Sequence, residues 1–164
     1  MSSYPYRYER TALVADLQER FDALEPGAES GTQARIAGRL MTIRKQGKVA
    51  FADLRDTTGR IQLFAQQAVL GDDAMEAFAA LGVGDIVGAG GEVLRTRRGE
   101  LSVKVDVVTL LAECLRPMPE KWHGITDVES RYRQRYLDLL LNDDPRRALD
   151  ARARANSAIR AFLE

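Results

Sequence analysis

Apolar residues recur every three or four positions near the start of the chain and every second position after it. The first pattern predicts an amphipathic helix over residues 11–24. Its apolar positions are Val14, Leu17, Phe21 and Leu24. A proline and two glycines within residues 25–33 then indicate an exposed linker. From Ala34 to Met41 the period changes to two, which predicts a first strand.

The middle of the chain contains further alternating segments separated by turn-forming residues. The elements expected there are a basic turn over 43–48, a hairpin over 49–64, a short helix over 71–85, a glycine-rich strand over 85–96 and a last strand over 101–111. We expect Asp72 or Asp73 to cap the helix and Gly82 to end it. The glycines of the fourth strand predict a bulge or sharp coiling.

In the last strand, Val103, Val105 and Val107 are expected on one side. Cys114 follows an aliphatic run, so we expect it to be a buried small hydrophobe.

Three strands, a helix and two strands are the order of an OB-fold, a five-stranded Greek-key barrel that commonly binds oligonucleotides. A doubly wound parallel sheet is disfavoured because helices do not alternate with strands. The expected parts are a helical extension and linker over 1–30, the OB-fold over 31–112, a connector over 113–128 and a further helical part over 129–164.

Two helices are predicted after the connector. Thr126 and Glu129 form a Thr-x-x-Glu capping box for the first, which runs to about Asn142. Asp144 is expected to cap the second, with Pro145 at its first position. Because the second helix has no stop signal before Glu164, we expect these helices to be poorly anchored without a partner or a further domain.

The hairpin has two contrasting faces. A turn over Asp56–Gly59 pairs Phe51 with Phe64 and Asp53 with Gln62, which leaves a uniformly apolar second face for the core. An aromatic ring among polar groups is a plausible platform for an unstacked base. Alternatively, the two rings pack against the first helix or the loop after the first strand.

The composition of the chain limits the kinds of site and the cellular compartment that can be expected. Lysine plus arginine equals aspartate plus glutamate at 24 each, so any basic surface must come from arrangement. Cys114 and His123 are each the only residue of their kind, which excludes a Cys/His zinc site within this chain. The chain has no disulfide partner, no apolar run of about 20 residues and no secretory signal, so the cytoplasm is the expected compartment.

Basic residues lie near the hairpin and in the turn between the last two strands. They are Arg35, Arg39, Arg44, Lys45, Lys48, Arg95, Arg97 and Arg98. Together they could counter a phosphate backbone. The residues alone therefore favour single-stranded nucleic-acid binding, with a structural or protein-binding barrel second and an enzyme third.

Three stretches carry a resemblance to a known family. "LRPMPEKWHGITDVESRYRQRYLDLL" closely resembles the segment that joins the anticodon-binding and catalytic domains of class II lysyl-tRNA synthetases. "GRLMTIRKQGKVAFADLRDTTGRIQLF" and "GDIVGAGGEVLRTRRGELSV" resemble strands of that family's OB-fold. The resemblance covers essentially residues 1–164, and its OB-fold part is shared with aspartyl and asparaginyl relatives.

The resemblance implies an anticodon site. Phe51 matches a ring that stacks on an anticodon base, Gln62 matches a glutamine that reads a uracil edge, and Glu100 matches a glutamate in the last turn. An arginine of the family corresponds to Arg44 or its neighbours, and Arg39 is the remaining candidate on the first strand. The implied partner is the anticodon loop of tRNA(Lys).

The same resemblance implies a larger enzyme that attaches lysine to tRNA with ATP and Mg²⁺ and acts as a homodimer. Its three catalytic motifs are expected beyond residue 164, so residues 129–164 read as a truncated start of the catalytic domain. We therefore expect no catalytic residue, metal or cofactor in this chain, and tRNA binding without aminoacylation. A stand-alone OB-fold module for single-stranded nucleic acid or for protein interaction is the alternative.

Overall fold

A computed structural model describes residues 4–118 and 125–164. The chain divides into two compact units, Met1–Pro117 and Met118–Glu164. Part of the expected connector, including His123, lies outside the described residues. Within the described ranges, no helix is long and apolar enough to cross a lipid bilayer.

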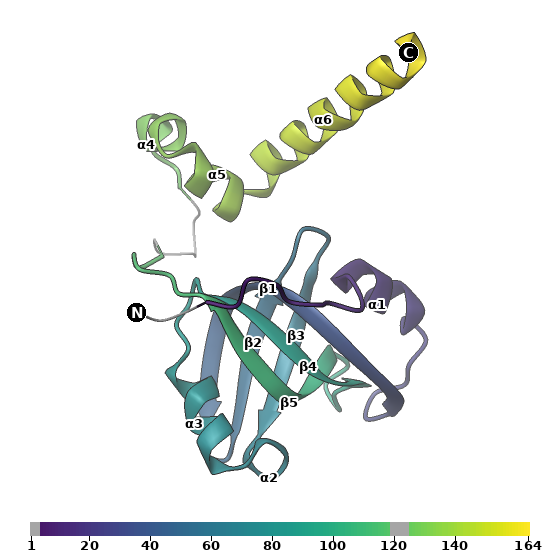
Figure 1. Ribbon diagram of the computed structural model, residues 1–164, viewed down its shortest axis with the longest axis vertical. Helices are drawn as coiled ribbons and strands as arrows, with labels where there is room; N and C mark the ends of the chain where they lie inside the picture. The colour runs from purple at the N-terminus through teal and green to yellow at the C-terminus, as the bar shows by residue number, and fades with distance from the viewer. Residues whose placement is uncertain (1–3, 119–124) are drawn as a thin grey trace. The chain divides into compact units, whose positions relative to one another are not determined.

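The first unit is a closed five-stranded barrel (Figure 1). Its strands are β1 (Glu29–Gln46), β2 (Val49–Arg55), β3 (Arg60–Gln66), β4 (Ile86–Arg95) and β5 (Leu101–Ala112). They neighbour one another in the order β1-β2-β3-β5-β4. The β3–β5 pair is parallel, and the other recorded pairs are antiparallel. Helix α1 (Val14–Arg20) precedes the barrel, and α2 (Gln67–Leu70) and α3 (Asp72–Ala80) lie between β3 and β4. The predicted OB-fold is confirmed.

The hairpin of β2 and β3 has the predicted register. Phe51 is opposite Phe64 and Asp53 is opposite Gln62. The alternate positions face the barrel interior and are almost completely buried; they are Ala50, Ala52, Leu54, Ile61, Leu63 and Ala65. A shift by one residue would exchange this apolar set for charged and amide side chains, so burial strongly favours the observed register.

The expected irregularity in the glycine-rich strand is present as a register shift between Gly90 and Gly91. A Cβ atom on Gly91 would lie 1.9 Å from the Lys104 carbonyl oxygen, so the close approach of β5 requires glycine. The shift leaves Asp106 as the extra residue on β5 and reverses the alternation beyond it. Val107 is therefore 46% exposed, and its predicted place beside Val103 and Val105 is wrong.

Strand β1 is longer than the sequence predicts at both ends. It begins at Glu29, inside the expected linker, and ends at Gln46, inside the expected basic turn. Glu29 pairs with Leu94 of β4, and Gln46 pairs with Val49 of β2. Pairing with two different neighbours extends the strand beyond what its local composition indicates.

Two helices of the first unit differ from expectation at their ends. Helix α1 is confined to Val14–Arg20, and α3 has Gly71 at its N-cap and Leu81 at its C-cap. The N-cap is therefore neither Asp72 nor Asp73, and the Asp72 carboxylate accepts instead from Gln67 Nε2 at 2.6 Å. Cys114 is half-buried rather than buried, and its Sγ lies 3.0 Å from the Arg116 carbonyl oxygen.

The second unit contains α4 (Val128–Arg133), α5 (Arg135–Leu141) and α6 (Asp143–Leu163). The single helix predicted from Thr126 is instead broken at Gln134. The capping residue is Asp127, whose carboxylate accepts from the Ser130 amide at 2.7 Å. Glu129 pairs with Arg133 instead of completing a capping box.

The long helix α6 also begins differently. Asn142 occupies the N-cap but makes no capping bond, because its side-chain amide donates instead to the Ile125 carbonyl and to Asp138 Oδ1. Asp144 is therefore not the cap, and Pro145 is the third helical residue rather than the first. Between α4 and α5, the fully buried carboxylate of Asp138 pairs with Arg131 at 2.8 Å and also with Arg135. Apolar side chains further along α6 remain exposed; they are Leu149, Ile159, Phe162 and Leu163.

The turn of the β2–β3 hairpin holds the start of α1. The Val14 amide donates to Asp56 Oδ2 at 2.9 Å, and the Ala15 amide donates to Thr58 Oγ1 at 3.0 Å. The first amides of a helix have no partner within the helix, so these bonds satisfy groups that would otherwise lack one. Asp56 also accepts from Thr58 and Gly59 of its own turn.

Asp56→Ala is expected to destabilise the chain by about 1–2 kcal/mol near neutral pH, because it removes a helix-capping acceptor. Burial alone would raise the pKa of Asp56, but the bonds from Val14, Thr58 and Gly59 together hold that pKa below its ordinary value. Because the pKa of Asp56 is lower in the folded than in the unfolded state, its ionised carboxylate stabilises the fold above about pH 4. This stabilisation is lost as the pH falls through the folded-state pKa of Asp56.

Urea unfolding at pH 7 and at pH 3 measures this effect. The difference between the parent chain and the Asp56→Ala variant should shrink at the lower pH. The exposed Asp22→Ala variant serves as a control with little effect at either pH. An equal destabilisation at both pH values would contradict the role assigned to the Asp56 carboxylate.

Candidate nucleic-acid interface

A groove of about 820 Å³ lies on the outer surface of the barrel. It is lined by residues of all five strands and by the turn between β4 and β5. Four of the five predicted site residues line it: Arg44, Phe51, Gln62 and Glu100. Arg39 does not line this groove; its Nη1 donates to the Gly84 carbonyl at 2.5 Å.

Two stacked aromatic rings form the apolar part of the groove. The centroids of Phe51 and Phe64 are 5.1 Å apart, and their planes differ by 12°. Both rings are half-buried, and both line the groove. The rings therefore pack on each other at the outer surface, where together they present a broad aromatic surface for a further flat group.

Beside the rings, Gln62 takes part in a short chain of side-chain hydrogen bonds. Its Nε2 donates to Glu100 Oε2 at 2.6 Å, and the Ser102 hydroxyl donates to its Oε1 at 3.0 Å. Gln62 is only 8% exposed, and Ser102 is 0% exposed. The parallel register of β3 and β5 creates this arrangement, because it places Gln62 opposite Ser102.

Arg95 was grouped with Arg97 and Arg98 as a possible phosphate contact, but its guanidinium bonds to backbone carbonyls. Its guanidinium donates to the Gly99 carbonyl at 2.9 Å and to the Phe21 and Asp22 carbonyls at 2.9 and 3.0 Å. Its buried Nε has no hydrogen-bond partner among the residues that the structure describes. Arg95 thus joins the end of α1 to the turn that carries Glu100, and its expected role as a phosphate contact is not favoured.

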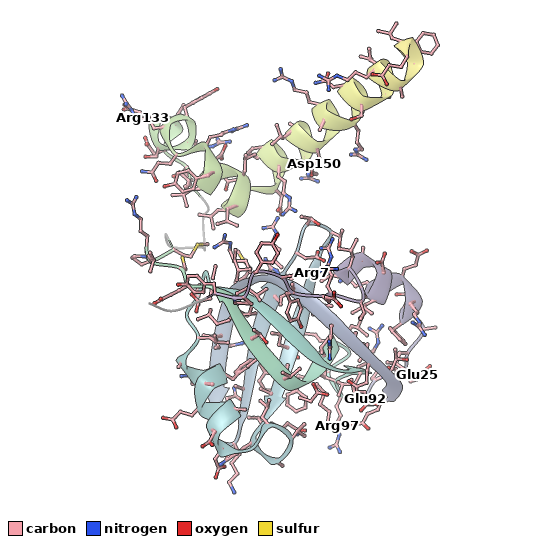
Figure 2. The ribbon with its side chains drawn as sticks, viewed as in Figure 1. Arg7, Glu25, Glu92, Arg97, Arg133 and Asp150 are labelled. Carbon is pink, nitrogen blue, oxygen red and sulfur yellow. The ribbon has the colours of Figure 1, made fainter. Side chains whose placement is uncertain are left out.

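Other charges remain at the rim of the groove. Arg97 and Arg98 are exposed, and Figure 2 shows Arg97 at the same end of the barrel as Glu92. Lys104 Nζ lies 2.8 Å from Glu29 Oε1, and this hydrogen bond raises the pKa of Lys104 against the opposing effect of burial. The groove therefore combines cations, carboxylates and amides around an aromatic centre, although the chain carries no net charge.

Sequence reasoning missed several polar residues of the groove, namely Glu29, Gln46, Gln66 and Lys104. The period-two pattern contained a signal for three of them. Gln46 follows Arg44 by two positions, Gln66 follows Phe64 by two, and Lys104 follows Ser102 by two. Glu29 had no such signal, because it lies in a segment whose composition indicates a linker.

The groove and the barrel together define a class of protein. Residues 34–111 match the family described as "OB-fold nucleic acid binding domain". A five-stranded barrel with an aromatic and polar outer groove is the usual form in which this fold presents a nucleic-acid site.

More specific similarity comes from individual relatives. The chain is 49% identical over 157 residues to the lysine–tRNA ligase of Moorella thermoacetica, and 47% identical over 167 residues to that of Xylella fastidiosa. It is 44% identical over 163 residues to the lysine–tRNA ligase of Pediococcus pentosaceus. These matches cover 96%, 99% and 98% of this chain, and 31%, 33% and 33% of the relatives.

The chain is therefore similar over nearly its whole length to lysine–tRNA ligases, and it corresponds to their N-terminal anticodon-binding OB-fold region. It spans about a third of the length of the curated relatives that it matches.

Arg95→Met is expected to destabilise the chain by roughly 1–3 kcal/mol, because it removes charge-assisted bonds to three carbonyls. Amide hydrogen exchange should also become faster at Gly99 and Glu100, since the turn loses its link to α1. Arg97→Met is the matched control, because Arg97 is exposed on the same turn. Equal stability and exchange in the two variants would show that Arg95 does not hold the turn.

Proposed function

We propose that this chain binds the anticodon loop of tRNA(Lys) as the anticodon-binding part of a lysine–tRNA ligase. The observation that carries the proposal is the juxtaposition, in one groove, of the stacked Phe51–Phe64 rings and the Gln62–Glu100 hydrogen-bonded pair. The similarity to lysine–tRNA ligases over nearly the whole chain supports the same assignment.

Each part of the groove offers a distinct interaction with an unstacked base. The exposed side of the aromatic pair supplies a stacking surface, which contributes roughly 1–3 kcal/mol per base. The amide of Gln62 supplies a donor, and the carboxylate of Glu100 supplies an acceptor. Arg44, Arg97 and Arg98 supply positive charge for the phosphates that flank the base.

The complete enzyme of this family is proposed to attach lysine to tRNA with ATP and Mg²⁺ and to act as a homodimer. We assign none of the described side chains to those steps. Among residues 4–118 and 125–164, no group of three or more histidine, cysteine, aspartate or glutamate side chains is arranged to hold a metal ion. The function proposed for the part of the chain that the structure describes is recognition of the anticodon.

Phe51→Ala is expected to weaken binding of a tRNA(Lys) anticodon stem-loop by roughly 1–3 kcal/mol through loss of stacking. Isothermal titration calorimetry on the parent chain and the variant measures the change. Phe162→Ala is the matched control, because this ring is 88% exposed on α6 and does not line the groove. Unchanged affinity of the Phe51→Ala variant would remove this ring from the binding site.

A second prediction separates anticodon recognition from general binding of single strands. The parent chain should bind the stem-loop with a middle uridine more tightly than one with a middle cytidine, at every salt concentration tested. Rising salt should weaken both complexes, because phosphate contacts release counterions. Equal affinity for the two RNAs would indicate a general single-strand module, and absence of RNA binding would favour a protein-interaction module.

A further inference from the structure

Ser102 is a completely buried hydroxyl on the outer side of β5. Its neighbours Val103 and Val105 are part of the hydrophobic core, whereas the Ser102 side chain contacts groove residues. Its Oγ lies 3.0 Å from Gln62 Oε1 and 3.2 Å from the Glu100 carbonyl oxygen. A buried hydroxyl is retained at low cost only where it is hydrogen-bonded, and here both acceptors belong to residues of the proposed base-reading pair.

The two partners of the Gln62 side chain differ in how firmly they are held. Glu100 is exposed on the turn between β4 and β5, whereas Ser102 is enclosed within a paired strand. A base that bonds to Glu100 Oε2 shares that acceptor with Gln62 Nε2. The Ser102 hydroxyl is covered and remains available to Gln62 Oε1 when a base bonds to Glu100.

We propose that Ser102 is a positioning residue that sets the base preference of the groove through Gln62; the inference rests on the proposed function. With Oε1 held by Ser102, the amide presents N–H toward the groove beside the carboxylate of Glu100. A donor next to an acceptor complements the carbonyl and N3–H of uracil. The corresponding edge of cytosine carries an amino group and an unprotonated nitrogen, so it offers the reverse pattern.

The test compares the affinities of the chain for anticodon stem-loops with a middle uridine and a middle cytidine. Ser102→Ala should lower the uridine-over-cytidine affinity ratio by roughly three- to tenfold, the equivalent of one lost hydrogen bond. Ser30→Ala is the matched control. Its hydroxyl also bonds within the barrel, at 2.6 Å from the Val93 carbonyl oxygen, but not to the reading pair.

A double-mutant cycle separates positioning from a purely structural effect. Gln62→Met alone should abolish most of the preference, and Ser102→Ala should then cause no further loss in that background. The side-chain amide resonances of Gln62 should also shift in the single Ser102→Ala variant. Ser102→Cys, which has a weaker donor of similar size, takes the place of the alanine variant if the latter does not fold.

The outcomes distinguish the inference from the function on which it rests. An unchanged ratio in Ser102→Ala, or a further loss in the Gln62→Met background, overturns the positioning role while anticodon recognition stands. A parent chain that does not distinguish the two RNAs overturns anticodon recognition, and the role of Ser102 falls with it. A lower affinity for both RNAs with the ratio preserved shows a structural role only and also overturns the inference.

Discussion

The parallel pairing of β3 with β5 is the contact on which the barrel and its groove both depend. It closes the barrel by joining segments about forty residues apart, with Leu63 beside Val103 and Gln62 beside Ser102. Alternate residues of this pair serve different purposes: one set fills the core, and the other lines the outer groove. A slip of one residue would bury amide and ammonium groups and expose the core, so burial of the apolar set also fixes the polar site.

Helix α1 links two turns of the barrel by hydrogen bonds. Its first amides bond to Asp56 and Thr58 in the β2–β3 turn, and carbonyls at its end accept from Arg95. Arg95 also bonds to the β4–β5 turn that carries Glu100. A helix of seven residues has little stability by itself, so these tertiary bonds and its buried residues Val14 and Leu17 hold it in place. Through Arg95, the end of α1 is linked to the β4–β5 turn, which borders the groove.

Local pattern and tertiary context contributed unequally to what could be predicted. The hairpin register, the order of helices and strands along the chain and the glycine bulge follow from alternation and from glycine geometry, which act over a few residues. The ends of helices were predicted less well. Asp127 caps α4 in place of Thr126, and Glu129 pairs with Arg133, because several side chains close together could satisfy the same amides. Val107 was misplaced because the bulge at Asp106 reverses the alternation of the positions that follow it, up to the second register shift of the β4–β5 pair.

For the candidate site, the alternation of residues was enough to predict an aromatic and amide-bearing hairpin face opposite an apolar one, and a family resemblance suggested roles for Phe51, Gln62 and Glu100. Which of these groups contact one another depends on the three-dimensional fold. It placed Ser102 against Gln62, committed Arg95 to backbone carbonyls, and kept Arg39 out of the groove lining. The reason is physical: alternation specifies the face of a strand on which a side chain lies, whereas closure of the barrel specifies its neighbours across strands that are distant in sequence.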